Sequence, residues 1–266
     1  MHVVVLVISR KGVVKRWDRE RTIWIKRSET APPWVSIRLI EGNITEENSD
    51  KPVISDSPAI LNLDCEDSYA PGIYQKTIYA LASTLRSVPN ATYFVRTNLS
   101  THICWPRLLS YLQNLDPQYT GVGHASDSWV PGWGIVMSRR VAEVLVQQGG
   151  PGSPEFIADQ PPDDVQIGRV LFKCGIYCTF KNNTILPSPG YFWDNTISIT
   201  DNVGKICRDP EIVFVRLREA PLRNRLAIMC ELDKRVPSPW ASKRGLRPYQ
   251  RLRLEQLKRL GNITSQ

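Results

Sequence analysis

Short apolar runs alternate along the chain with longer segments in which apolar residues recur at helical spacing. An uninterrupted apolar run of a few residues is typical of a strand that is covered on both faces. Such runs predict strands at Val3–Ile8, Val35–Ile40, Ala59–Leu63, Tyr93–Val95, Tyr119–Val122, Gly134–Met137 and Ile212–Val215.

Helical spacing fills several of the intervals between these runs. Ile73 and Ala80 lie on one face of a predicted helix over Tyr69–Leu85. Ser138 is a suitable N-cap for a helix that continues through Val146. The other predicted helices are Lys15–Ile25, His102–Leu115, one that starts just after Pro162, and Pro221–Leu232. This alternation predicts an α/β fold with a mostly parallel sheet, which binds ligands at the carboxyl ends of its strands.

The composition is typical of a globular protein, with 42% hydrophobic and 23% charged residues among 266. No apolar run approaches the roughly 20 residues that a membrane-spanning helix needs. Met1 and His2 lead directly into the first apolar run, which is too short for a signal peptide. We therefore expect a cytoplasmic protein, or one that has lost an anchor.

The six cysteines are expected to be free thiols. Cys174 and Cys178 stand one helical turn apart, but no second pair completes a zinc site. An even number of cysteines permits disulfides, although nothing in the sequence indicates secretion. The thiols of Cys65, Cys104, Cys174, Cys178, Cys207 and Cys230 are therefore expected to be reduced and buried.

The net charge of +8 comes from one segment near the C-terminus. Nine Lys or Arg residues and a single Glu lie between Lys234 and Arg259. Such a basic segment suits contact with a membrane surface or with an anionic partner. Nucleic acid is disfavoured, because only Trp240 and Tyr249 interleave with the charges. The alternative is a solvated helix with a stripe of Leu246, Leu257 and Leu260.

Polar residues gather directly after three of the predicted strands, at Ser9–Arg21, Asp64–Asp67 and Arg96–Ser100. Because parallel strands end at one edge of a sheet, these segments are expected to converge. A site with both cations and carboxylates suits a phosphorylated substrate and a general base. The chain has neither a GxGxxG dinucleotide motif nor a P-loop motif.

Asp163 and Asp164 form a fourth polar group, at the start of a predicted helix. A carboxylate within hydrogen-bond reach can take the proton of an attacking hydroxyl. Acidic residues are also common in a first helical turn, because they interact favourably with the helix dipole. Spacing alone leaves both interpretations open.

Several motifs, in order, resemble those of the fringe and β-1,3-galactosyltransferase-like glycosyltransferases, which have the GT-A fold. Asp64–Tyr69 (DCEDSY) with Lys76-Thr77 is similar to the family's D-F-x-D-S-Y-x-N-L-T-x-K-T segment and is the most specific match. Asp163–Gly168 is similar to the family's [ED]-D-V-x-x-G helix start. The remaining matches are Ile8-Ser9, Arg16 and Arg21–Trp24 to I-S…R…R-x-T-W, and Pro131–Ser138 to S-G-G-G-Y-V-L-S. The resemblance covers residues 3–176.

The resemblance implies an inverting transfer from a nucleotide sugar, usually a UDP-sugar, to a hydroxyl of a glycan or glycoprotein. It implies a GT-A-like domain over residues 1–233, with about 1–125 holding the nucleotide sugar and 126–233 most of the acceptor. Residues 234–266 are then a basic C-terminal extension. Asp164 becomes the expected general base, with Asp163 as the second candidate. The donor-binding candidates are Ser9, Arg10, Arg16, Arg21, Asp64, Asp67, Lys76, Arg96, Thr97, Asn98, Ser100, Gly132, Trp133, Gly134, Arg216 and Arg218.

The chain departs from the family where a metal usually binds. Family members carry a D-D-D or D-x-D motif whose acids hold Mn²⁺ against the diphosphate, and Asn98-Leu99-Ser100 stands at this position. Asn98 and Ser100 are weak ligands for Mn²⁺ or Mg²⁺, which prefer charged oxygens. We therefore expect that arginines replace the metal and that no cofactor is needed, with Mn²⁺ or Mg²⁺ bound at Asn98 and Ser100 as the alternative. Arg216 and Arg218 are the candidates, because a guanidinium binds phosphate bidentately.

Trp133 is a second departure, because the family usually has Gly or Ala there, beside the expected sugar pocket. A large ring would shrink this pocket, so we expect a compact donor sugar such as xylose, with galactose or GlcNAc as alternatives. Core packing is the other interpretation of this side chain. Trp129, Tyr191 and Trp193 are candidates for acceptor binding, because aromatic faces suit sugar rings.

Asn98 also fits the N-x-[ST] pattern for glycosylation, as do Asn43, Asn90, Asn182 and Asn262. The family alignment places Asn98 at the bottom of the donor cleft, where a glycan would not fit. A function from a different class also stays open. The chain would then be a nucleotide-sugar or glycan-binding module that lost catalysis together with its D-x-D motif.

Overall fold

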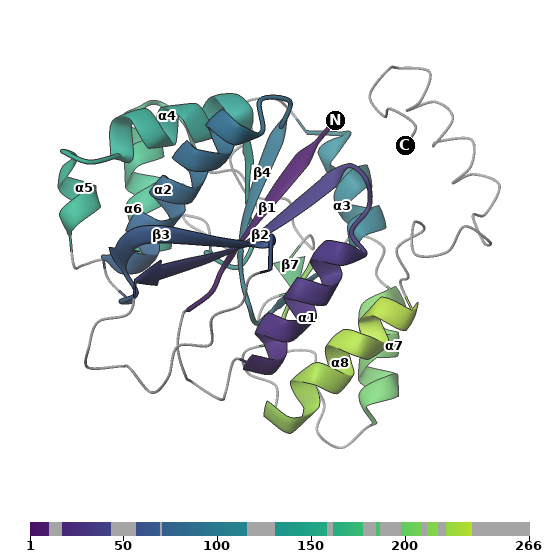
Figure 1. The fold of residues 1–266 in the computed structure, drawn as a ribbon. Helices are drawn as coiled ribbons and strands as arrows, with labels where there is room; N and C mark the ends of the chain where they lie inside the picture. Colours follow the sequence, from purple (N-terminus) through teal and green to yellow (C-terminus); the bar gives the residue numbers. More distant parts are fainter. Residues whose placement is uncertain are drawn as a thin grey trace.

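A computed structural model describes residues 1–10, 18–43, 57–69, 71–115, 131–158, 162–177, 185–186, 198–208, 212–217 and 222–235. Its centre is a five-stranded sheet with the order β3-β2-β1-β4-β6 (Figure 1). The strands are β1 (Val3–Ile8), β2 (Val35–Asn43), β3 (Ile60–Glu66), β4 (Tyr93–Asn98) and β6 (Ile135–Ser138). All neighbouring pairs are parallel except β4 and β6. The predicted α/β class with a mostly parallel sheet is confirmed.

Helices cover both faces of this sheet, and β1 contributes to a hydrophobic core on each face. Val4 and Leu6 belong to the core beneath one helical layer, whereas Val5 and Val7 belong to the core beneath the other. The first layer contains α2 (Gly72–Ser87), α4 (Arg139–Gly149), α5 (Pro154–Ile157) and α6 (Asp163–Lys173), and the second contains α1 (Asp18–Glu29) and α3 (Trp105–Leu112). This two-sided burial explains why the strands are continuously apolar.

A smaller sheet lies beside the central one, with the order β5-β8-β7. Its strands are β5 (Thr101–Ile103), β8 (Phe214–Arg216) and β7 (Ile185–Leu186). The helices α7 (Ile199–Arg208) and α8 (Leu222–Arg235) pack together and share a third apolar core with residues beside and within β8. Because β5 follows β4 almost at once, the small sheet brings the end of β8 close to the end of β4.

The predicted helix over His102–Leu115 is wrong at its start. Residues 101–103 form β5, which pairs antiparallel with β8, and the helix begins at Trp105. Cross-strand pairing outside the local sequence therefore overrides the helical spacing. The first helix also runs later than predicted, from Asp18 to Glu29. The predicted strand Tyr119–Val122 lies outside the described residues.

The other predicted helices agree with the structure to within a few residues. Ser138 caps α4 as predicted, and its hydroxyl accepts a hydrogen bond from the Val141 amide. Among the described cysteines, Cys65, Cys104, Cys174 and Cys207 are free thiols. Only Cys104 of these four is buried and Cys174 is exposed, so the expectation of burial is wrong for Cys174. Within the described part of the chain, no helix is both long enough and apolar enough to cross a membrane.

Candidate functional site

Five polar residues form a buried cluster where β1, β2 and β3 end, called here the Ser9 cluster: Ser9, Arg21, Glu41, Asp67 and Lys76. The Ser9 hydroxyl donates to Glu41 Oε1 over 3.0 Å, and Arg21 donates to both Glu41 oxygens at 2.7 and 3.2 Å. Lys76 Nζ donates to the Ser9 carbonyl at 3.0 Å and pairs with Asp67. The cluster ties three strand ends to α1 and α2.

Each cation of the Ser9 cluster is matched by a carboxylate inside the cluster. Arg21 pairs with Glu41, and Lys76 pairs with Asp67. Glu41 is 1% exposed and Lys76 is 2% exposed, so neither offers its charge to solvent. These contacts support a structural role, although four of the five residues were predicted to bind the donor.

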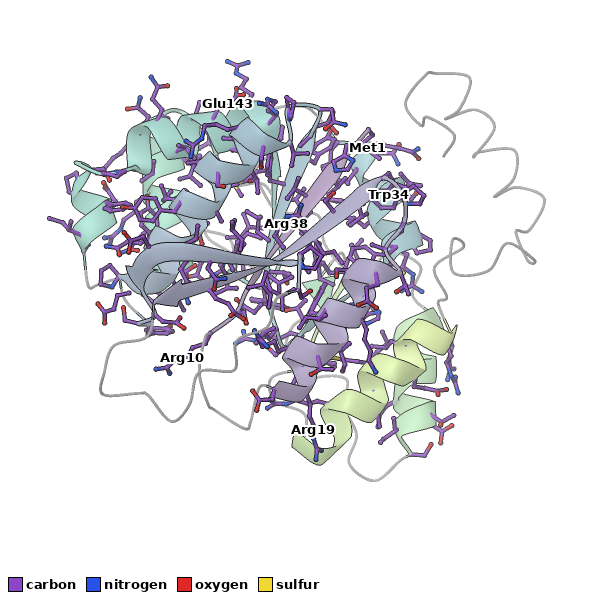
Figure 2. The ribbon with its side chains drawn as sticks, in the orientation of Figure 1. Met1, Arg10, Arg19, Trp34, Arg38 and Glu143 are labelled. Carbon is purple, nitrogen blue, oxygen red and sulfur yellow. The ribbon has the colours of Figure 1, made fainter. Side chains whose placement is uncertain are left out.

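Glu41 was missed by sequence reasoning. It directly follows the predicted strand Val35–Ile40, which is the same signal that selected the other strand-end residues. The parallel register pairs Ile8 with Ile40, and so it places Ser9 beside Glu41. Arg10 and Asp64 were also predicted here, and both residues are exposed. Arg10 extends away from the end of β1, opposite to Met1 and Trp34 (Figure 2).

A second cluster lies beside the first, because Ile8 of β1 is paired in register with Asn98 of β4. This Arg96 cluster consists of Arg96, Asn98, Gly132, Asp163 and Asp164. The Arg96 guanidinium donates to Asn98 Oδ1 over 3.1 Å and forms an ion pair with Asp163. The arginine is 1% exposed. It therefore joins the end of β4 to the first turn of α6.

The two adjacent carboxylates of α6 have different partners. Asp163 pairs with Arg96 and also accepts backbone N–H groups at the helix start, whereas Asp164 accepts the backbone N–H groups of Gly132 and Val165. Gly132 N donates to Asp164 Oδ2 over 3.1 Å, and Val165 N donates to Asp164 Oδ1 over 3.0 Å. Burial raises the pKa of Asp163, the Arg96 guanidinium partly offsets this, and the neighbouring Asp164 charge raises it further.

Gly132 packs so closely against Arg96 that there is no room for a side chain at residue 132. A Cβ on this residue would stand 2.3 Å from Arg96 Nη1. The next residue is held from two sides: Thr97 Oγ1 donates to the Trp133 carbonyl over 2.9 Å, and the Arg216 guanidinium lies 5.2 Å from the Trp133 ring centroid. Trp133 is 7% exposed and also belongs to the core beneath α1 and α3.

Asn98 and Ser100 do not fit a divalent metal. Asn98 Oδ1 already accepts from a guanidinium, whose positive charge would repel a metal ion at that oxygen. Ser100 is 5% exposed, and its carbonyl accepts from the Leu217 amide. Across the described ranges, no three His, Cys, Asp or Glu side chains gather closely enough to hold a metal ion.

The structure thus brings together Arg96, Thr97, Asn98, Gly132, Trp133, Arg216 and both acids. Gly134 lies just before β6 and belongs to the same segment. Five predicted site residues lie outside the described residues: Arg16, Trp129, Tyr191, Trp193 and Arg218. The basic segment from residue 236 onward also lies outside them.

The chain was also compared with protein-family models, curated proteins and solved structures. No protein-family model matches the chain, and no curated protein matches it. A solved structure titled "Crystal structure of a glycosyltransferase involved in the glycosylation of the major capsid of PBCV-1" aligns with 86% of this chain and 98% of its own length. The TM-score is 0.45 and the sequence identity is 7%. A likeness at this level carries no argument about function.

Proposed function

We propose that the protein is a glycosyltransferase that moves a sugar from a nucleotide sugar, expected to be a UDP-sugar, to an acceptor hydroxyl. The observation that carries this proposal is that two carboxylates, Asp163 and Asp164, converge with the buried Arg96 near the end of β4. Gly132 lies against Arg96 at the same point and donates its amide to Asp164. The carboxyl edge of a mostly parallel sheet is where such folds bind their ligands. Two of the segments that resemble the fringe-like family, Pro131–Ser138 and Asp163–Gly168, contact each other here through Gly132 and Asp164.

Asp164 is the proposed general base. Each of its oxygens accepts one backbone N–H, and a carboxylate has further lone pairs that can accept an acceptor hydroxyl. The hydroxyl oxygen would form a bond to the anomeric carbon while Asp164 takes its proton. The bond from that carbon to the UDP oxygen would break, and UDP would leave with the electron pair. A single displacement of this kind inverts the anomeric configuration.

Arg216 is the proposed partner of the leaving diphosphate. Its guanidinium lies over Trp133 at the end of β8, beside the Arg96 cluster. A guanidinium can bind phosphate oxygens bidentately and keeps its charge at all working pH values. Arg218 is a further candidate from the sequence. Since Asn98 and Ser100 do not fit a metal, no metal is assigned to this step.

Trp133 supports the proposal of a compact donor sugar, such as xylose. The backbone carbonyl of Trp133 accepts from Thr97, and its side chain is 7% exposed with the ring beneath Arg216. It therefore cannot move aside easily to admit a larger sugar. Equal turnover of UDP-xylose and UDP-glucose by the full chain would contradict this part of the proposal.

The test of the function is a transfer and hydrolysis assay of the full chain with a panel of UDP-sugars, run with EDTA and with added Mn²⁺. We expect turnover of at least one donor, unchanged by EDTA. Loss of turnover in EDTA that Mn²⁺ alone restores would contradict the role given to the arginines. Donor binding without any turnover would favour the second candidate, a binding module. The absence of acids at Asn98-Leu99-Ser100 is the observation in favour of that candidate.

A further inference from the structure

Arg96 is an interior residue of the central sheet and not a surface cation. It lies on β4, between β1 and β6, and is 1% exposed. One terminal nitrogen bonds Asn98 two residues along the same strand, and the other pairs with Asp163 on α6. Its Nε has no hydrogen-bond partner among the described residues. A buried guanidinium is costly unless it is paired, and the ion pair with Asp163 offsets part of that cost.

The single charge of Arg96 meets two neighbouring carboxylates and pairs directly with only one. Asp163 receives the ion pair in addition to backbone N–H groups at the helix start, whereas Asp164 receives the backbone N–H groups of Gly132 and Val165. Two carboxylates with unequal environments can take unequal roles in a reaction. Asp163 is thus held in place by the arginine, whereas Asp164 has remaining lone pairs that can accept a substrate hydroxyl.

We propose that Arg96 is a positioning residue that pairs with Asp163 and holds its carboxyl group in place, and thereby presents Asp164 as the group that takes the acceptor proton. This inference rests on the proposed function, since the proton comes from the acceptor hydroxyl. Arg96 itself touches no reacting atom. It was expected from the sequence to bind the donor, and its burial argues for this different role.

Gly132 is the second element of this arrangement. Its amide holds Asp164, and its α-carbon lies so close to Arg96 that a Cβ would stand 2.3 Å from Nη1. The guanidinium has little freedom to retreat, because it is buried and bonded on both terminal nitrogens. Because Gly132 has no side chain, the segment that contains it can contact both Arg96 and Asp164.

The kinetic test measures kcat and KM for the best UDP-sugar in four variants of the full chain. We expect Asp164→Asn to lower kcat on the order of 10³-fold, and Asp163→Asn only about tenfold, because an amide oxygen still accepts from Arg96. Arg96→Met combined with Asp163→Asn should lower kcat about 100-fold with a donor KM within about threefold of wild type. Arg96→Lys alone should lower kcat less than this double variant does, since it keeps both the charge at residue 96 and the carboxylate of Asp163.

The proposal is overturned if Asp163→Asn is as damaging as Asp164→Asn. It is also overturned if removing Arg96 raises the donor KM while kcat stays unchanged. The paired substitution at residues 96 and 163 removes both charges, so that no buried charge is left alone to prevent folding.

A stability test of the same contact needs no activity. Gly132→Ala should lower Tm by about 4–8 °C in the wild-type background, because it overpacks against Arg96. In the background with Arg96→Met and Asp163→Asn, this loss should fall to less than half. Gly149→Ala is the matched control, since its Cβ would stand 2.3 Å from the Tyr74 hydroxyl, and its effect should be the same in both backgrounds.

Equal effects of Gly132→Ala in the two backgrounds would overturn the proposed contact between Gly132 and Arg96. If the wild type turns over no donor, the proposed glycosyltransferase function fails. The stability result would still decide whether Arg96 is held as described, so the two failures can be told apart.

Discussion

The Ser9 cluster and the Arg96 cluster are both buried charge networks at the carboxyl edge of one sheet, yet their charges are arranged differently. In the Ser9 cluster, two cations meet two carboxylates and each pair is closed. In the Arg96 cluster, one arginine pairs with one of two adjacent acids, and the other acid is held by backbone donors. Location at a strand end therefore does not by itself identify a catalytic group. A carboxylate without a cationic partner in its own cluster is the more informative feature.

The comparison is tested most strongly by Asp164→Asn. We expect kcat to fall on the order of 10³-fold, because an amide cannot take the acceptor proton, while Tm stays within a few degrees of wild type. Transfer kinetics and thermal unfolding measure the two effects. Asp18→Asn is the matched control, because Asp18 is an exposed acid in the first turn of α1. Wild-type turnover after Asp164→Asn would place the chemistry elsewhere.

The Ser9 cluster predicts the opposite pattern. Lys76→Met should lower the free energy of unfolding by about 3–5 kcal/mol, because it leaves Asp67 buried without its cation. The kcat per folded molecule should remain close to wild type. Lys173→Met is the control, since the Lys173–Glu155 pair is largely exposed on the lysine side and should contribute little. Native stability with a raised donor KM would instead return Lys76 to a binding role.

Arg216→Ala should have a smaller effect, confined to the donor. We expect the KM for the UDP-sugar to rise about tenfold, because a charge-assisted contact with the diphosphate is lost. Inhibition by UDP should weaken by a similar factor. Arg208→Ala, an exposed arginine at the end of α7, is the control and should leave both constants unchanged. Equal weakening by the control would indicate a general field of positive charge.

His102 offers a pH effect that belongs to neither cluster. Burial lowers the pKa of His102 well below 6.5, and the charges of Arg27 and Arg107 lower it further. The unfolded chain therefore binds a proton first as the pH falls, so the stability from neutral His102 is present above pH 6.5 and lost below it. Urea unfolding at pH 7.5 and 5.5 should show a loss of roughly 1 kcal/mol. His102→Gln should remove that difference, and its persistence would assign the loss to other groups.

The sequence predicted the sheet and the acidic pair, but not the partners within each cluster. Continuous apolar runs located β1 to β4, because strands buried on both faces leave no polar face. The acids of α6 could be found because they follow Pro162 at a helix start. The pairing of Arg96 with Asp163 joins residues far apart in sequence, and that of Arg21 with Glu41 requires the register of β1 and β2. Local patterns do not contain either kind of information.

The antiparallel pairing of β5 with β8 was not predicted from the sequence, for the same reason. Thr101–Ile103 has a local pattern that continues into α3, and only contact with residues 214–216 makes it a strand. The end of β8 then brings Arg216 to Trp133. Arg216, from the last third of the chain, thus reaches the site because β8 pairs with β5, a strand that the helical spacing of residues 102–115 had predicted to be part of a helix.

The ion pair between Arg96 and Asp163 also has a consequence for the chain during its synthesis. On the ribosome, β4 emerges well before α6, so a nascent chain that ends before residue 163 would have to bury the guanidinium without its carboxylate. That cost opposes closure of the central sheet around Arg96 until α6 has left the exit tunnel. Docking of α6 therefore sets the time at which both the sheet interior and the proposed catalytic carboxylate are completed.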